Sequence, residues 1–357
     1  MRQRIRFVAT EDGTSLAWAD VGSGPALVRA SNWLTHLEYD WQSPVWRHWT
    51  RFFADRFRYI RYDERGCGMT DREVGELSFD RWVADLEDVV QAAGHRQPFE
   101  QMVLFGVSQG AAVAIAYAVA HPERVSKLIL YGGYAVGAKG RSDADHRAAY
   151  QAMQELARVG WDKTNPAFRQ VFTSRFIPEG TERQIDWFND LCVRTTTPEI
   201  AYRLLDARAD VDVRHLLQRV RVPTLVLHAD KDEVIPVEEG RRLARDIPDA
   251  TFVPLDSRNH VLLEDQPAWQ DFQEAVEAFT GTGAAGWPGA GTSAPLTRRE
   301  RQALHLLCRG LSNAALAREL GIAEKTARNH LSHLYAKLGV SSRTEAMVRA
   351  RERGLAD

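Results

Sequence analysis

The chain has 357 residues, of which 44% are hydrophobic and 26% are charged, and its formal net charge is −2. These proportions are those of folded globular proteins, so they exclude a wholly disordered, collagen-like or disulfide-stapled chain, and the length suggests two domains. The charge is unevenly divided: residues 294–357 carry 12 basic and 6 acidic side chains, whereas the preceding residues carry 34 and 42. A basic segment of net charge +6 behind an acidic one of net charge −8 indicates nucleic acid at one end of the chain only.

Three cysteines, Cys67, Cys192 and Cys308, lie far apart in the sequence. None has the spacing of a zinc site, so we expect no metal and no cofactor, and a sparse, odd number of cysteines is typical of a reducing compartment. The N-terminal residues contain no apolar run long enough for a signal peptide. The longest apolar stretch, residues 111–120, is far shorter than the roughly 18 residues of a membrane-spanning helix. We therefore expect a cytoplasmic protein that does not contact a membrane.

Residues 1–280 alternate between short apolar runs typical of β-strands and patterns typical of helices. The predicted strands are residues 26–28, 59–62, 102–105, 128–131, 224–228 and 251–255. The predicted helices are residues 79–93, 109–120, 238–246 and 269–279. This alternation predicts an α/β fold with a parallel sheet covered on both faces. Residues 137–219 contain only helical patterns, and such a long insertion is typical of a cap over a site.

The sequence Gly106-Val107-Ser108-Gln109-Gly110 lies between a predicted strand and an alanine-rich helix. This is the G-x-S-x-G pattern in the strand–turn–helix context of a nucleophilic serine. The turn that exposes the hydroxyl is so tight that the residues two before and two after the serine must lack side chains. Ser108 is therefore the candidate nucleophile, and the alternative is an ordinary loop serine.

A nucleophilic serine needs a histidine base and a carboxylate that orients it, in the chain order Ser, Asp or Glu, His. Asp232 follows the predicted strand 224–228 and is the candidate acid, with Asp230 as the competitor. His260 follows the strand 251–255 on a loop before a helix and is the candidate base. The alternatives are a structural turn aspartate and a solvated loop histidine.

With these motifs, residues 1–280 resemble an α/β-hydrolase domain: a doubly wound, mostly parallel sheet with a helical cap at about residues 137–219. The sequence of residues 63–70, DERGCGMT, resembles the D-x-R-G-x-G-x-S turn of that family, which has a structural role. The resemblance implies that Ser108 attacks an acyl or similar carbon, that His260 takes and returns the proton, and that Asp232 holds the imidazole.

The sequence departs from the family at the strand that leads to the oxyanion loop. This strand usually ends in His-Gly, whereas here residues 26–33 read ALVRASNW. An oxyanion hole needs preorganised backbone N–H groups, and loss of one donor costs roughly 10²–10³ in rate. The backbone of Gln109 is the first candidate donor, and that of Asn32 or Trp33 is the second.

Six tryptophans lie in positions from which they either line an apolar pocket or pack the cap on the body: Trp33, Trp41, Trp46, Trp49, Trp161 and Trp187. The first alternative predicts a small, largely apolar ligand.

Residues 281–294 read GTGAAGWPGAGTSA, with five glycines and no charge. A segment of this composition cannot bury a core, and it predicts a flexible linker between two tethered domains.

Residues 295–357 contain four helical patterns, at residues 298–308, 313–320, 324–338 and 343–352. Ser312 is a good N-cap for the second, and Gly321-Ile322-Ala323 forms a short turn before the third. Two helices across such a turn form a helix-turn-helix. The exposed face of the third helix carries side chains suited to the major groove of double-stranded DNA: Lys325, Thr326, Arg328, Asn329, Ser332, His333 and Lys337.

The motifs LTRRER at residues 296–301, KTARNHL at 325–331 and KLGVSSRTEA at 337–346 resemble the LuxR-type helix-turn-helix. The resemblance implies that Arg328, Asn329 and Ser332 face bases, and that phosphates are held by Lys325, Thr326 and Lys337. Helix-turn-helix proteins commonly bind as dimers, so we expect a homodimer paired through the last helix or the cap.

A DNA-binding domain tethered to a ligand-handling domain is the arrangement of a one-component regulator. The sequence predicts a transcription factor whose α/β-hydrolase domain senses a small molecule. Whether this domain also hydrolyses the molecule is left open by the sequence. Two alternatives stay open: an active serine esterase or related hydrolase with a DNA-binding appendage, and a non-catalytic hydrolase-fold receptor.

Overall fold

The structure of the protein is a computed structural model. The structure describes residues 2–282, 298–322 and 342–352, together with residues 327, 331, 334, 335, 338, 340 and 355. Within these residues no helix is both long and apolar enough to span a membrane.

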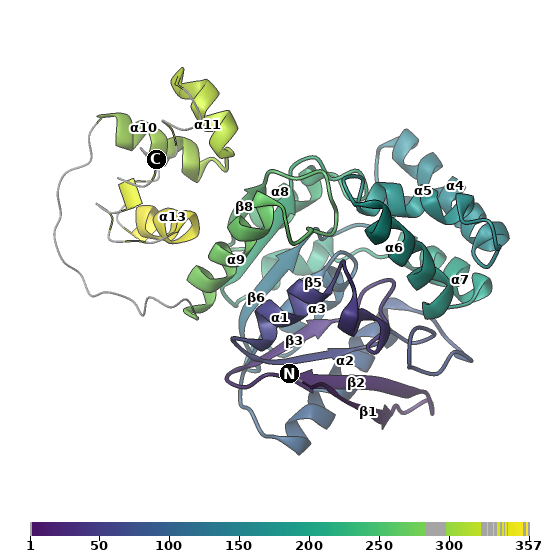
Figure 1. The fold of residues 1–357 in the computed structure, drawn as a ribbon. Coiled ribbons are helices and arrows are strands. Elements are labelled where there is room, and N and C mark those ends of the chain that lie inside the picture. The colour runs from purple at the N-terminus through teal and green to yellow at the C-terminus, as the bar shows by residue number, and fades with distance from the viewer. Residues whose placement is uncertain are drawn as a thin grey trace.

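An eight-stranded sheet runs through the N-terminal part of the chain in the order β1-β2-β4-β3-β5-β6-β7-β8 (Figure 1). Only the pairs that involve β2 are antiparallel, and the other five pairs are parallel. The strands are β1 Arg4–Ala9, β2 Ser15–Val21, β3 Ala26–Ala30, β4 Arg58–Tyr62, β5 Met102–Val107, β6 Val125–Tyr131, β7 Thr224–Ala229 and β8 Thr251–Leu255. The predicted mostly parallel sheet is thus confirmed, and β1 and β2 add an antiparallel edge that was not predicted.

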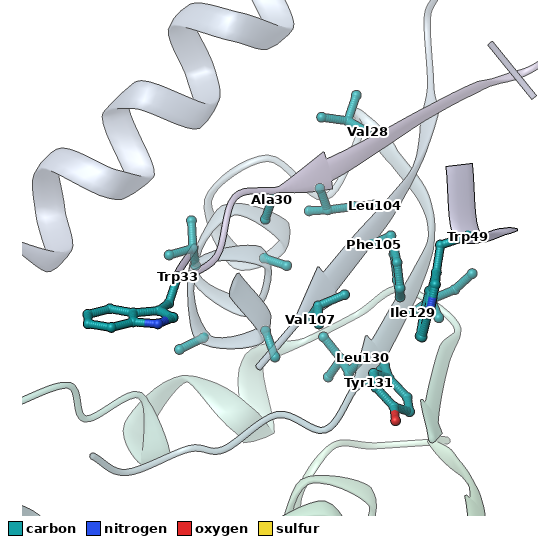
Figure 2. Packing of buried hydrophobic residues seen from close by; sticks show 14 of the residues in the cluster. Val28, Ala30, Trp33, Trp49, Leu104, Phe105, Val107, Ile129, Leu130 and Tyr131 are labelled. Atoms are coloured by element: carbon teal, nitrogen blue, oxygen red, sulfur yellow. The ribbon is translucent and has the colours of Figure 1, made fainter. Parts of the chain in front are cut away.

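Helices connect the parallel strands, as the alternating pattern predicts. They are α1 Arg47–Ala54, α2 Phe79–Arg96, α3 Gly110–Ala120 and α8 Val237–Asp246, and a further helix, α9 Pro267–Thr280, follows the last strand. α1 and α9 pack against each other through aromatic rings, with Trp49 4.7 Å from Phe272 and 4.9 Å from Trp269 between ring centroids. Figure 2 shows Trp49 beside Phe105 of β5, whereas the ring of Trp33 points away from these strands.

The segment between β6 and β7 is helical. It contains α4 Ala144–Gly160, α5 Ala167–Phe176, α6 Glu182–Thr195 and α7 Pro198–Ala209, with the short 3-10 helices Ala138–Gly140 and Arg214–Arg219 at its two ends. Its single β-feature is an isolated bridge between Val136 and Asp212. Figure 1 shows these helices grouped beyond one edge of the sheet, and we call them the cap.

The C-terminal part has a hydrophobic core of its own. Its described helices are α10 Arg298–Cys308, α11 Asn313–Leu320 and α13 Arg343–Glu352. Ser312 caps α11, because its Oγ accepts the backbone N–H of Ala315 (3.2 Å), and Gly321 ends that helix with a φ of 65°. The predicted third helix is described at Ala327, Leu331, Leu334, Tyr335 and Leu338, which are helical, and the leucines and the alanine among them are buried.

α13 contacts α9 and β8 of the N-terminal part (Figure 1). Arg351 Nη1 donates a hydrogen bond to the carbonyl oxygen of Ala250, 3.1 Å away. The two parts, expected from sequence to be tethered by a flexible linker, therefore also touch through this helix.

Candidate active site

Ser108 occupies the sharp turn between β5 and α3, with a φ of 52° that a non-glycine residue rarely adopts. Its backbone N–H donates to the carbonyl oxygen of Tyr131 (2.9 Å), which fixes the turn to the neighbouring strand. A Cβ on Gly106 would lie 2.6 Å from the Cα of Ala111, and one on Gly110 would lie 2.8 Å from the carbonyl oxygen of Ala30. Both glycines of the motif are thus required by the close approach of backbone.

Asp232 and His260 are buried and hydrogen-bonded to each other, although 28 residues separate them in the chain. The imidazole Nδ1 lies 2.6 Å from Asp232 Oδ2. The other carboxylate oxygen accepts the backbone N–H groups of Val234 (2.8 Å) and Ile235 (3.0 Å). Burial would raise the pKa of Asp232, but the charge and hydrogen bond of His260 outweigh it, so this pKa is lowered. Asp232 is therefore held as a carboxylate against the imidazole.

Asp230, the competing candidate, has different contacts. Its Oδ1 accepts the backbone N–H of Ser257 (3.3 Å), and burial raises its pKa. It fastens the turn after β7 to the loop after β8, whereas Asp232 is the aspartate that touches His260.

Gly132, directly after β6, provides the space for the aspartate–histidine pair. A Cβ at this position would lie 3.1 Å from His260 Cε1 and 3.9 Å from Asp232 Oδ2, and the residue has a φ of 55°. Sequence reasoning did not single out this glycine. The available signal was the Gly132-Gly133 pair at the end of a predicted strand.

The Nε2 atom of His260 is buried and makes no hydrogen bond within the described residues. The hydroxyl of Ser108 is therefore not bonded to it in this structure. Catalytic hydrogen bonds are often long or absent without substrate and tighten when substrate binds, so this arrangement leaves the base free to receive a proton.

Side chains of α1 and of the cap hold the loop that carries His260. The carbonyl oxygen of Leu262 accepts two hydrogen bonds of 3.0 Å, from Trp49 Nε1 and His48 Nε2. On the cap side the ring of Phe176 meets the imidazole edge to face, at 5.3 Å between centroids. The predicted loop histidine is thus buried between two elements, one of which, α1, was not predicted.

The candidate oxyanion-hole residues lie at the ends of β3 and β5. None of the backbone N–H groups of Asn32, Trp33 and Gln109 donates to a protein acceptor in the described part of the chain. The side chain of Asn32 is occupied, since it donates to the carbonyl oxygen of Trp33 (3.0 Å) and accepts from Arg29. Backbone N–H groups without a protein acceptor are the groups that can receive a developing negative charge.

Ser108 and Gln109 lie in the wall of a cavity between the body and the cap. The cavity has a volume of about 680 Å³, which includes its open mouth. Of the six candidate tryptophans, Trp33 lines it, while Trp49 packs in the core and Trp161 meets Trp33 edge to face (5.3 Å). The rest of the lining is mostly apolar or aromatic and comes mainly from the cap, for example Tyr134, Tyr150, Met153, Phe172 and Leu205.

Residues 63–70 have the structural role expected of them, with one addition. The carboxylate of Asp63 accepts the backbone N–H groups of Leu37 (3.0 Å) and Met69 (2.8 Å). Glu64, however, forms a buried ion pair with Arg208 of the cap, and Arg208 also donates to Gln109 Oε1 (3.1 Å). The contacts Glu64–Arg208 and Arg208–Gln109 thus connect this turn to the residue next to Ser108, and the sequence motif does not predict them.

The side chains predicted to contact DNA lie outside the described residues: Lys325, Thr326, Arg328, Asn329, Ser332, His333 and Lys337. Among the residues that are described, no group of three or more His, Cys, Asp or Glu side chains is placed to hold a metal ion.

Two family models match the chain. The model "Serine aminopeptidase, S33" matches residues 47–267, and the model "Bacterial regulatory proteins, luxR family" matches residues 294–350. Because the first match covers more than half of the chain, the chain belongs to this family of α/β hydrolases. It also carries a LuxR-family DNA-binding domain, which makes it a regulator with a hydrolase-fold domain.

Individual proteins resemble one part or the other. The AB hydrolase superfamily protein YisY of Bacillus subtilis is 28% identical over 71% of this chain and 91% of its own length. The 3-oxoadipate enol-lactonase 2 of Acinetobacter baylyi is 28% identical over 75% of this chain and 94% of its own length. The probable HTH-type transcriptional regulator GfsR of Streptomyces halstedii is 42% identical over 80 residues, which are 22% of this chain and 33% of that protein.

Solved structures show the same fold. An esterase from Exiguobacterium antarcticum matches with a TM-score of 0.65 and 24% identity, over 77% of this chain and 98% of its own. A bromoperoxidase from Bacillus anthracis matches with a TM-score of 0.66 and 19% identity, over 78% of this chain and 100% of its own.

Proposed function

We propose that this protein is a transcriptional regulator whose hydrolase-fold domain binds a small acyl compound beside Ser108 and thereby controls DNA binding by the C-terminal domain. The observation that carries the proposal is the buried Asp232–His260 pair beside a serine turn that opens into a cavity, on a chain that ends in a LuxR-family domain.

The proposed chemistry follows from the geometry. Ser108 Oγ attacks the carbonyl carbon while His260 Nε2, which has no hydrogen-bond partner among the described residues, takes the proton. Asp232 stabilises the imidazolium that forms. The backbone N–H groups of Gln109 and of Trp33 or Asn32 receive the developing oxyanion. The leaving group departs with the proton from His260, and water then releases the acyl group.

At the other end of the chain, we expect a homodimer to place the third helix of each C-terminal domain in the major groove of double-stranded DNA. Lys325, Thr326 and Lys337 would hold phosphates. Arg328, Asn329 and Ser332 would read bases, with His333 on the same face.

The test compares wild type, Ser108→Ala and the control Ser174→Ala, which removes a hydroxyl outside the cavity. Hydrolysis of short 4-nitrophenyl esters is measured, together with affinity for a DNA site selected from a random pool, with and without ester. We expect Ser108→Ala to abolish turnover and to change the effect of the ester on DNA affinity, and Ser174→Ala to change neither.

The other outcomes discriminate between the alternatives. If the wild type hydrolyses esters but no ester changes its affinity for DNA, the result contradicts ligand control and favours a hydrolase with a DNA-binding appendage. If the wild type hydrolyses no ester, yet an ester changes the DNA affinity of wild type and of Ser108→Ala equally, the result contradicts catalysis and favours a receptor.

A further inference from the structure

Three polar side chains of the cap line the cavity among its apolar and aromatic residues: Arg141, His146 and Arg175. Arg141 follows the first short helix of the cap, His146 lies in the first turn of α4, and Arg175 lies in the last turn of α5. They are close together, because Arg141 Nη1 is hydrogen-bonded to His146 Nε2 and both guanidinium charges act on the imidazole.

Neither Arg141 nor Arg175 forms an ion pair within the described part of the chain. Arg141 Nε donates to the carbonyl oxygen of Val136 (3.1 Å), and Arg141 Nη2 has no protein acceptor among the described residues. Arg175 donates to the thioether of Met153 (2.9 Å) and to the carbonyl oxygen of Glu233. A thioether is a weak acceptor, and the carboxylates whose charges act on these guanidinium groups, Glu239 on Arg141 and Glu233 and Asp232 on Arg175, form no ion pair with them.

A third arginine in the same cavity behaves differently. Arg208 is buried and paired with the carboxylate of Glu64. The described residues thus supply a counter-charge for one guanidinium of the cavity and none within ion-pair distance for the other two.

The pKa of His146 reflects its burial and the excess of positive charge in this part of the cavity. Burial, followed by the positive charges of Arg141 and Arg175, lowers the pKa of His146 to about 4. The imidazole is therefore neutral near pH 7 and accepts a hydrogen bond from Arg141 rather than adding a third cation. Burial also lowers the pKa of both arginines, and the charges of Glu239 on Arg141 and of Glu233 and Asp232 on Arg175 offset this only in part.

Placing partly buried charges in an apolar cavity costs free energy unless an opposite charge is supplied. Guanidinium groups match carboxylates in geometry, and charge-assisted hydrogen bonds are the strongest that such groups make. We propose that the cavity takes an acyl compound with a second, anionic group, a carboxylate, which binds Arg141 and Arg175 while its ester, lactone or amide carbonyl faces Ser108. The largely apolar ligand expected from the tryptophans thus acquires a charged end.

This proposal rests on the proposed function, since it places the reacting carbonyl at Ser108. Its test uses the mono(4-nitrophenyl) esters of succinic, glutaric and adipic acids, each paired with the analogue in which the free carboxylate is a methyl ester. The quantity measured is the ratio of kcat/KM for the anionic ester to that for its neutral analogue, for wild type, Arg141→Met and Arg175→Met.

The matched control is Arg158→Met, because Arg158 lies on the exposed side of α4 in an ion pair with Glu155. Arg175→Lys keeps the charge and tests whether the site needs the cation rather than the shape. Thermal unfolding of each variant reports whether it folds.

We expect wild type to prefer the anionic ester of one chain length by about 10- to 100-fold, the range typical of a hydrogen bond to a charged group. Arg141→Met and Arg175→Met should bring the ratio close to 1, Arg175→Lys should retain part of it, and Arg158→Met should leave it unchanged. A wild-type ratio of 1 or below for all three acids, or a ratio that folded Arg141→Met and Arg175→Met both retain, would overturn the proposal.

If the protein hydrolyses none of these esters, this result contradicts the catalytic part of the proposed function. The anion site is then tested by binding alone. Calorimetry then compares the corresponding 4-nitroanilides with a free and with a methylated carboxylate. Tighter binding of the anionic compound that is lost in Arg141→Met and Arg175→Met supports the anion site, and equal binding or no binding overturns it.

Discussion

At the scale of single residues, His260 fits in its position because its neighbour Gly132 has no side chain. Gly132→Ala would introduce a methyl group 3.1 Å from His260 Cε1, and its φ of 55° costs a further 1–2 kcal/mol or so in a non-glycine residue. We expect this variant to lose stability and most ester hydrolysis, because the imidazole must move away from Asp232. Unfolding in urea and kcat/KM measure the two effects.

Gly13→Ala is the matched control for this prediction. Gly13 also has a positive φ, of 84°, but no heavy atom lies within 4 Å of a Cβ built on it. It should therefore show the conformational cost without the loss of activity. If both variants lost activity equally, the crowding of His260 would not be the cause.

His48 makes stability depend on pH. Burial lowers its pKa to about 4 from an ordinary value of 6.5. Between these two values the unfolded chain binds the proton and the folded chain does not, so His48 contributes a loss of stability as the pH falls from 6.5 to 4. The loss is on the order of 3 kcal/mol, from 1.36 kcal/mol per pKa unit.

The measurement compares urea unfolding of wild type and His48→Gln at pH 7 and pH 4.5. The variant keeps a side-chain N–H that can reach the carbonyl oxygen of Leu262 but does not titrate in this range. Its stability should fall less over this interval than that of wild type, and parallel pH profiles would show that another group is responsible.

At the scale of elements, the strands that carry the site were predictable and the parts that brace it were not. β5, β7 and β8 are apolar runs followed by Ser108, Asp232 and His260, so both their existence and the order of the triad candidates can be deduced from sequence. β1 was missed because arginines interrupt its apolar residues (RIRFVA), and none of its residues is fully buried.

Long-range contacts account for the other omissions. The choice between Asp232 and Asp230 as the acid depends on which carboxylate faces the imidazole. The two residues lie in the same turn, and their positions in the sequence do not show which one does. The ion pair of Glu64 with Arg208 joins residues 144 positions apart, and no local pattern predicts it.

The predicted third helix of the C-terminal domain gives two contrasting variants. Lys325→Ala should weaken binding to all DNA and lower the salt dependence by about one ion, because a phosphate contact is lost. Arg328→Ala should instead relax the preference at one base pair, by about 1–3 kcal/mol. Titrations on the selected site and on random DNA, at several salt concentrations, measure both, and an equal loss on the two DNAs for Arg328→Ala would contradict its assignment to a base.

At the scale of the whole molecule, the division of charge matches the division of tasks. The N-terminal part is acidic, so we expect the affinity for DNA to come from residues 294–357, whose net charge is +6. The net charge of −2 for the whole chain conceals this polarity. The proposed ligand chemistry and the expected DNA recognition thus fall to parts of opposite charge.

α9 is the helix of the N-terminal part on which α13 of the C-terminal part packs. It begins at Pro267, a few residues after the His260 loop, and its Trp269 packs on His48, with 4.5 Å between ring centroids, while α13 rests against the same helix. If occupation of the cavity alters the fit between α9 and α13, the two binding equilibria share one coupling free energy, and thermodynamic reciprocity applies. Operator DNA must then change the affinity for the ligand by the same factor by which the ligand changes the affinity for DNA, so that the genome itself becomes an effector of the hydrolase-fold domain.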